Sequence, residues 1–121
     1  MDFSPASSHA FVGSPSLVVL PNGDYLASHA DFGPATTGRT TQVFRSRNGG
    51  VAWEPVAGSP VQPMTWATIF QIRGTVYLMG VAKDTYGDVV ISRSTDKGDT
   101  WSSPKTLLSG TYHTGDTPPD P

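Results

Sequence analysis

The feature that most constrains this 121-residue chain is a short segment that occurs twice. Residues 46–53 read SRNGGVAW, and residues 94–101 read STDKGDTW. Ser, Asn or Asp, Gly and Trp recur in register, 48 residues apart. Because a fixed internal period is the signature of repeat architectures, the chain is expected to build one structural unit twice.

A second pair of landmarks lies upstream of each copy. Tyr25 and Leu26 match Tyr77 and Leu78, an offset of 52 residues. The two offsets differ by four residues, which predicts a longer loop in the first copy at about 31–40. A repeat of about 50 residues is the length of one blade of a β-propeller.

Each copy is expected to contain four short strands separated by turn residues. In the first copy they lie at about 16–20, 24–29, 40–46 and 53–57, and in the second at about 66–72, 75–82, 88–94 and 101–108. Asn22-Gly23 and Arg73-Gly74 supply the turn residues of the first hairpins. Thirteen glycines and eleven prolines, spread between β-rich runs, favour turns over long helices.

The apolar pattern of the strands indicates how the sheets pack. Residues 17–20, 76–81 and 89–91 are nearly continuous apolar runs, which is typical of sheets covered on both faces. Four-stranded sheets stacked around an axis meet that demand. The expected fold is therefore all-β, with two four-stranded antiparallel blades in one partial propeller, residues 1–121. Blade one is expected at about 12–58 and blade two at about 64–110, with 111–121 leading into a further blade.

Composition excludes several classes of partner. Eight basic and ten acidic residues give a net charge of −2 without a basic cluster, so nucleic acid is not an expected partner. The longest purely apolar run, 17–20, is too short to span a membrane, and residues 1–11 lack the pattern of a signal peptide. The chain is thus expected to be soluble and, by default, cytoplasmic. It has no cysteine and no cofactor motif, and the spacing of its three histidines matches no metal site.

The second repeated segment, Ser94-x-Asp96-x-Gly98-x-Thr100-Trp101, is a complete Asp-box. In this respect, and in residues 14–27, the chain resembles the sialidase-like superfamily of Asp-box, or BNR-repeat, propellers. The resemblance extends over about 12–113 and implies a ring of six blades, of which two are encoded here. The first box has Asn48 and Ala52 in place of Asp and Thr, although Asn can still cap the turn. We expect both boxes to be structural; their residues are Ser46, Asn48, Gly50, Trp53, Ser94, Asp96, Gly98, Thr100 and Trp101.

The resemblance also implies a chemistry, that of exo-α-sialidases, which are glycoside hydrolases. Such enzymes need an arginine cluster for the substrate carboxylate, an Asp acid/base and a Tyr nucleophile activated by Glu. The segment that would carry the first arginine is Val12-Gly13-Ser14-Pro15, without one. In the next motif Asp31 is retained, whereas the arginine is replaced by Gly33. The remaining groups would belong to blades absent from this sequence, so the isolated chain is expected to be inactive.

The candidate site residues map to the edge of the blades opposite the boxes. Asp31 could act as a general acid, although an Asp at a strand end more commonly caps a loop. Trp66 could stack on a sugar ring or pack between blades. The remaining candidates could bind substrate or be solvated side chains; they are His29, Arg39, Asp84 and His113.

Three functions follow from these observations. The first is a carbohydrate-interacting part of a sialidase-like glycosidase, without a complete catalytic set. The second is a non-catalytic carbohydrate-binding or protein-interaction module that forms a homo-oligomer through its blade faces, because open apolar faces favour association. The third is a truncated gene product without a selected activity.

Overall fold

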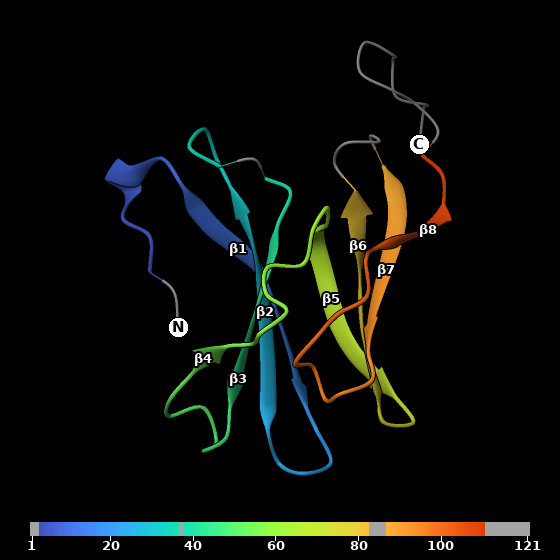
Figure 1. Cartoon of the computed structure of the whole chain (residues 1–121). Helices are drawn as coiled ribbons and strands as arrows, with labels where there is room; N and C mark the ends of the chain where they lie inside the picture. Colours follow the sequence, from blue (N-terminus) through green and yellow to red (C-terminus); the bar gives the residue numbers. More distant parts are fainter. Residues whose placement is uncertain (1–2, 37, 83–86, 111–121) are drawn as a thin grey trace.

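The computed structural model describes residues 3–36, 38–82 and 87–110, which form two separate four-stranded antiparallel sheets (Figure 1). Blade one follows a short 3₁₀ helix, η1 (Ala6–Ser8), and consists of β1 (Phe11–Val19), β2 (Tyr25–Phe32), β3 (Thr41–Ser46) and β4 (Glu54–Pro55). Blade two consists of β5 (Thr65–Ile72), β6 (Thr75–Ala82), β7 (Asp88–Ser94) and β8 (Lys105–Leu108). The predicted all-β fold with two four-stranded antiparallel sheets is confirmed. The segment 111–121 lies outside the described residues.

Strand bounds differ from the prediction by more than one residue in four strands, β1, β2, β4 and β8. β1 begins at Phe11 because its pairing with β2 continues past an irregularity between Gly13 and Ser16, as far as Phe11 opposite Phe32. This extension places Asp31 within a strand. β4 begins at Glu54 and β8 at Lys105, so both Trp residues belong to the box turns, where each indole N–H donates to the carbonyl of a box glycine at 2.9 Å.

The strand register corrects the sequence alignment of the two copies. The irregularity at 13–16 recurs at 65–68, and the positive φ of Ser14, 52°, recurs at Trp66, also 52°. The first strands are therefore 52 residues apart. Val18 and Phe70 are therefore equivalent. Their partners in the second strands are Leu26 and Tyr77, which are only 51 residues apart.

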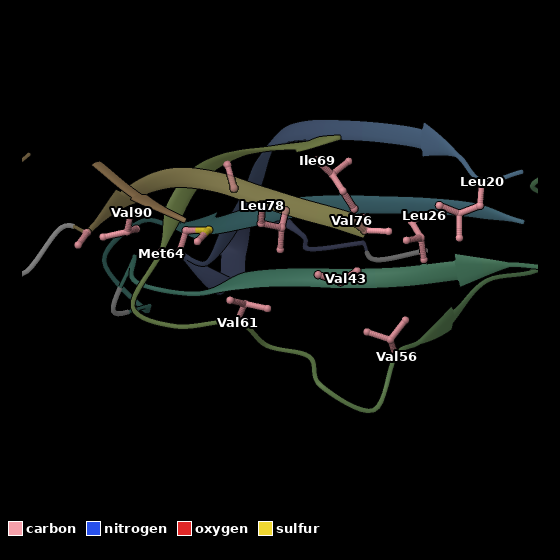
Figure 2. Packing of buried hydrophobic residues seen from close by; sticks show 12 residues of the cluster. Leu20, Leu26, Val43, Val56, Val61, Met64, Ile69, Val76, Leu78 and Val90 are labelled. Carbon is pink, nitrogen blue, oxygen red and sulfur yellow. The ribbon is translucent and has the colours of Figure 1, made fainter. Parts of the chain in front are cut away.

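Leu26 is thus equivalent to Tyr77, and its match with Leu78 was wrong by one residue. Because strand side chains alternate, a slip of one residue exchanges the two faces of a sheet. Leu26 and Leu78 lie on opposite faces of their own blades and meet in the same core (Figure 2). The four-residue difference between the copies is therefore divided. One residue lies in the first hairpin turn and three lie in the connection between the second and third strands.

The core lies between the two sheets. Leu26 and Val43 of blade one, and Val76 and Leu78 of blade two, are exposed by 1% or less, and all belong to one hydrophobic cluster (Figure 2). Burial of such side chains contributes about 1.5–3 kcal/mol each relative to leaving them in water. The packing of one blade on the other is therefore the main source of stability.

Hydrogen bonds across the same interface fix the relative position of the blades. The Ile69 N–H donates to Ser16 Oγ at 3.0 Å, and Gln71 Nε2 donates to the Val19 carbonyl at 3.0 Å. The Thr41 hydroxyl donates to the Met64 carbonyl, also at 3.0 Å. Because these groups are directional, they select one register of the two apolar faces.

A buried arginine closes the lower end of the interface. Arg45 on β3 is only 4% exposed, and its Nε lies 3.4 Å from Asp24 Oδ2 in the same blade. Its two terminal nitrogens cross to blade two, where they donate to Asp99 Oδ1 and to the Lys97 carbonyl. The guanidinium therefore connects the blades through the second box turn.

We predict that Arg45→Ala lowers the free energy of unfolding by about 2–3 kcal/mol, because the substitution removes charged hydrogen bonds and leaves Asp24 and Asp99 without their cation. Urea unfolding followed by circular dichroism measures the change. Arg93 is the matched control, since it holds the equivalent position in blade two but is exposed. Arg93→Ala should stay within about 0.5 kcal/mol of the wild type. Equal losses in the two variants would contradict the assigned role.

Candidate functional site

A polar cluster lies at the upper edge of blade one, where β1 begins and β2 ends (Figure 1). Asp31 Oδ2 accepts hydrogen bonds from Thr40 Oγ1 at 3.1 Å and from Gln42 Nε2 at 3.2 Å. His29 Nδ1 lies 3.6 Å from Asp31 Oδ1. The Asp31 carboxylate therefore ties the end of β2 to the start of β3 and also orients the imidazole.

His29 also forms the wall of a hollow. Its ring stacks on Phe44, with centroids 5.6 Å apart and planes at 22°. Both rings line an apolar hollow of about 460 Å³ on the face of blade one that points away from blade two. Its other lining residues include Val12, Leu17 and Ala27. The hollow therefore belongs to a sheet face rather than to the upper edge alone.

Two positions where the resemblance implies arginines are closely surrounded. Gly33 has a φ of 102°, and a Cβ atom there would lie 2.6 Å from the Phe11 ring and 2.8 Å from the His9 carbonyl oxygen. A Cβ at Gly13 would lie 2.9 Å from the Phe32 ring. Since real Cβ atoms essentially never approach other atoms so closely, residue 33 accepts no longer side chain without a shift of the backbone.

The other predicted site residues are placed separately. The Arg39 carbonyl accepts from the Met64 N–H at 2.9 Å, which holds the exposed Arg39 beside the start of β5. Trp66 lies near the start of β5 and is 67% exposed. Asp84 and His113 lie outside the described residues. The structure thus brings Asp31 and His29 into one cluster on blade one, whereas Trp66 lies in blade two and Arg39 lies beside the start of β5.

Sequence reasoning missed the partners of Asp31. Thr40 and Gln42 are two residues apart, and an Asp in β2 reaches them because His29 pairs with Gln42. The polar residues Thr40 and Gln42 are visible in the sequence of the hairpin. Only the register of β2 and β3 shows that their side chains reach Asp31.

The two box turns share a core set of hydrogen bonds, and the second turn adds one from the Thr100 hydroxyl to Asp96 Oδ2. In the second turn, Ser94 Oγ accepts from the Gly98 N–H at 2.8 Å, and Asp96 Oδ1 accepts from the Thr100 N–H at 2.9 Å. In the first turn, Ser46 Oγ accepts from the Gly50 N–H and Asn48 Oδ1 from the Ala52 N–H, both at 2.8 Å. The side-chain oxygen of Asn48 therefore accepts the same backbone hydrogen bond as the Asp96 carboxylate, but it carries no charge.

The described residues contain neither a cluster suited to a metal ion nor a helix able to span a membrane. No three His, Cys, Asp or Glu side chains in 3–36, 38–82 and 87–110 gather closely enough to hold a metal ion. No helix within these ranges has the length and apolarity needed to cross a membrane.

Comparison with solved structures shows the fold. The Penicillium chrysogenum α-L-arabinanase complexed with arabinobiose is 25% identical over 73% of this chain, with a TM-score of 0.56. The Trypanosoma rangeli sialidase in complex with the inhibitor DANA is 19% identical over 69% of the chain, also with a TM-score of 0.56. A polysaccharide lyase of family PL25, an ulvan lyase, is 20% identical over 84%, with a TM-score of 0.65.

These similarities identify the two sheets as part of a sialidase-like β-propeller. The chain spans only 30%, 13% and 26% of those three structures, respectively. No protein-family model and no curated protein matches the sequence.

Asp96 provides a test of the second box turn. Hydrogen bonds from the Thr100 hydroxyl and N–H lower the pKa of Asp96 from 3.8 to about 2. A lowered pKa in the folded state stabilises the fold above the unfolded pKa, and this contribution is lost as the pH falls through about 2. We therefore predict that Asp96→Asn is less stable than the wild type at neutral pH, and that the difference shrinks between about pH 4 and pH 2.

Thermal unfolding at a series of pH values measures this difference. The matched comparison is Asn48→Asp, which should introduce a pH dependence of the same sign but smaller size into the first turn, because Ala52 supplies an N–H and no hydroxyl. A gap between wild type and Asp96→Asn that stays constant over this range would contradict the assigned hydrogen bonds.

Proposed function

We propose that this chain is a carbohydrate-interacting part of a sialidase-like propeller that lacks a complete catalytic set. The observation that carries the proposal is Trp66, a large aromatic side chain that is 67% exposed on a backbone with a φ of 52°. Positive φ is unfavourable for a bulky residue, and such strain is often found at functional sites. An exposed indole offers a flat apolar surface on which a sugar ring can stack.

The chemistry of the upper edge supports binding rather than hydrolysis. Asp31 is engaged by Thr40, Gln42 and His29, which suits a role in positioning these groups better than that of a free acid. Gly33, where the resemblance implies an arginine, is closely packed by Phe11. A sialidase mechanism would need both an arginine cluster and a Tyr/Glu pair, so we expect no glycoside hydrolysis by this chain alone.

The comparison structures support a saccharide as the ligand class. The Penicillium arabinanase was determined with arabinobiose and the ulvan lyase with a sulfated glucuronosyl-rhamnose unit. In our proposal, Trp66 supplies the stacking surface and Arg39, beside the start of β5, supplies a polar contact, while His29 contributes from the cluster on blade one.

We predict that Trp66→Ala weakens binding to the best saccharide on a glycan array by about tenfold or more, because the stacking surface is removed. Folding should be retained, since the side chain is mostly exposed. Calorimetric titration with arabinobiose and with a sialoside measures the affinity, and thermal unfolding measures the stability.

The control variants separate stacking from backbone strain. Trp66→Phe should keep part of the affinity. Trp66→Gly should lose it and yet be at least as stable as Trp66→Ala, because glycine adopts positive φ without a Cβ penalty. A wild-type chain that binds no saccharide on the array would overturn the proposal, and release of a fluorogenic product from a sialoside would contradict the expected inactivity.

A second candidate function is self-assembly through the blade faces, and the exposed apolar side chains favour it. Leu17 and Val19 on blade one are 56% and 51% exposed, and Ile72 and Met79 on blade two are 55% and 40% exposed. Soluble monomers rarely leave such sheet faces uncovered. With two blades per chain, at about 12–58 and 64–110, three copies would complete a ring of the six blades implied by the resemblance.

For this candidate we predict a solution mass above that of the 12.8 kDa monomer at micromolar concentration. Open apolar faces provide the driving force for association. Light scattering coupled to size-exclusion chromatography measures the mass at several concentrations. A folded monomer at every concentration would contradict self-assembly but would leave the saccharide proposal in place.

A further inference from the structure

The interface between the blades identifies which residues of blade two face outward. Residues of β6 alternate between the shared core, where Val76 and Leu78 lie, and the outer face, where Tyr77 and Met79 lie. By register, Tyr77 corresponds to Leu26 and Met79 to Ser28. The outer face of blade two is thus equivalent to the face of blade one that is buried inside this chain.

This face, which we call the open flank of blade two, is more apolar than its buried equivalent. Met79 replaces Ser28 and, on the third strand, Val89 replaces Thr41. Besides Met79 and Val89, the open flank has apolar side chains from three neighbouring strands; they include Phe70, Ile72, Tyr77, Val81 and Ile91. A surface that repeats a buried interface, with more apolar area, is suited to the same kind of partner.

The matching surface is the outer face of blade one, which we call the open flank of blade one. It is equivalent to the face of blade two that receives blade one: Leu17 corresponds to Ile69, and Ala27 corresponds to Leu78. This flank carries the hollow of about 460 Å³, which Ala27 lines together with His29 and Phe44, the equivalents of Gly80 and Ser92 in blade two. The hollow is an apolar recess that side chains of a second copy could enter.

We propose that the open flank of blade two binds the open flank of blade one in a second copy of the chain, head to tail, in the register of the internal interface. This inference deepens the self-assembly candidate above and rests on it. The larger side chains of one flank and the hollow of the other are complementary in size. Tyr77 then lies over Gly50, as Leu26 lies over Gly98 within the chain.

Charge distinguishes the new interface from the internal one. Arg45 reaches Asp99 and the Lys97 carbonyl, whereas its equivalent Arg93 would meet Val51 and the Gly49 carbonyl. Val51 is 85% exposed. The association between copies therefore lacks one ion pair of the internal interface, and it should be weaker and reversible.

The test uses one substitution on each flank. Leu17→Asp places a carboxylate on the open flank of blade one, and Met79→Asp places one on that of blade two. Both sites are partly exposed in the monomer, so circular dichroism should show a normal fold. Each variant alone should lose self-association by roughly 100-fold or more in sedimentation velocity, because a buried carboxylate would be unpaired.

The mixture of the two variants decides the orientation. A head-to-tail interface uses different flanks of the two copies, so Leu17→Asp and Met79→Asp should together form a one-to-one dimer and nothing larger. If either variant alone still dimerises, or if the mixture stays monomeric while the wild type associates, the head-to-tail register is wrong but self-assembly stands. A monomeric wild type overturns both.

A third variant tests the register itself. Val51→Asp restores the acid that Asp99 supplies within the chain, and it should tighten association about tenfold through a charge-assisted contact with Arg93. Adding Arg93→Ala to Val51→Asp should abolish that gain. A gain that persists without Arg93, or no gain from Val51→Asp, would overturn the assigned register.

Discussion

Leu26 of blade one lies against Gly98 of blade two, where a Cβ atom would come within 2.4 Å of its side chain. This contact links the conformation of the box turn to the packing of one blade on the other. Gly98 has a φ of 92° and is therefore needed by the turn itself, and it also leaves the space into which the neighbouring blade packs. The box turn thus ends a hairpin and also forms part of the surface that receives the next sheet.

The same turn explains why a charged residue is tolerated in the interface. Burying an arginine is costly unless its hydrogen bonds are satisfied. The second box turn offers Asp99 and the Lys97 carbonyl to the terminal nitrogens of Arg45. Its Nε makes no hydrogen bond but lies 3.4 Å from Asp24 Oδ2, which balances its charge. The first box turn has the same backbone hydrogen bonds, but it carries Val51 and Gly49 at these positions. The two turns therefore share a backbone conformation but present different side chains to a neighbouring blade.

At the upper edge, the residues of the candidate site were only partly predictable. The sequence indicated Asp31, His29, Arg39 and Trp66 because of their types and their places near strand ends. It could not indicate that Asp31 is held by Thr40 and Gln42, since hydrogen bonds across a hairpin depend on register. The exposed, positive-φ conformation of Trp66 likewise follows from the irregular pairing near the start of β5, which no composition or spacing reveals.

The sequence by itself determined the two copies, their four strands each and the turns between them, because these features depend on local patterns. Alternation, turn glycines and the box hydrogen bonds all act within a few residues. Only the tertiary structure decided which face of each strand is buried. Arg45 and Arg93 precede the same serine in the two copies, yet Arg45 is buried and Arg93 is exposed. The physical reason is that blade two covers one of them, and nothing local distinguishes a covered face from an open one.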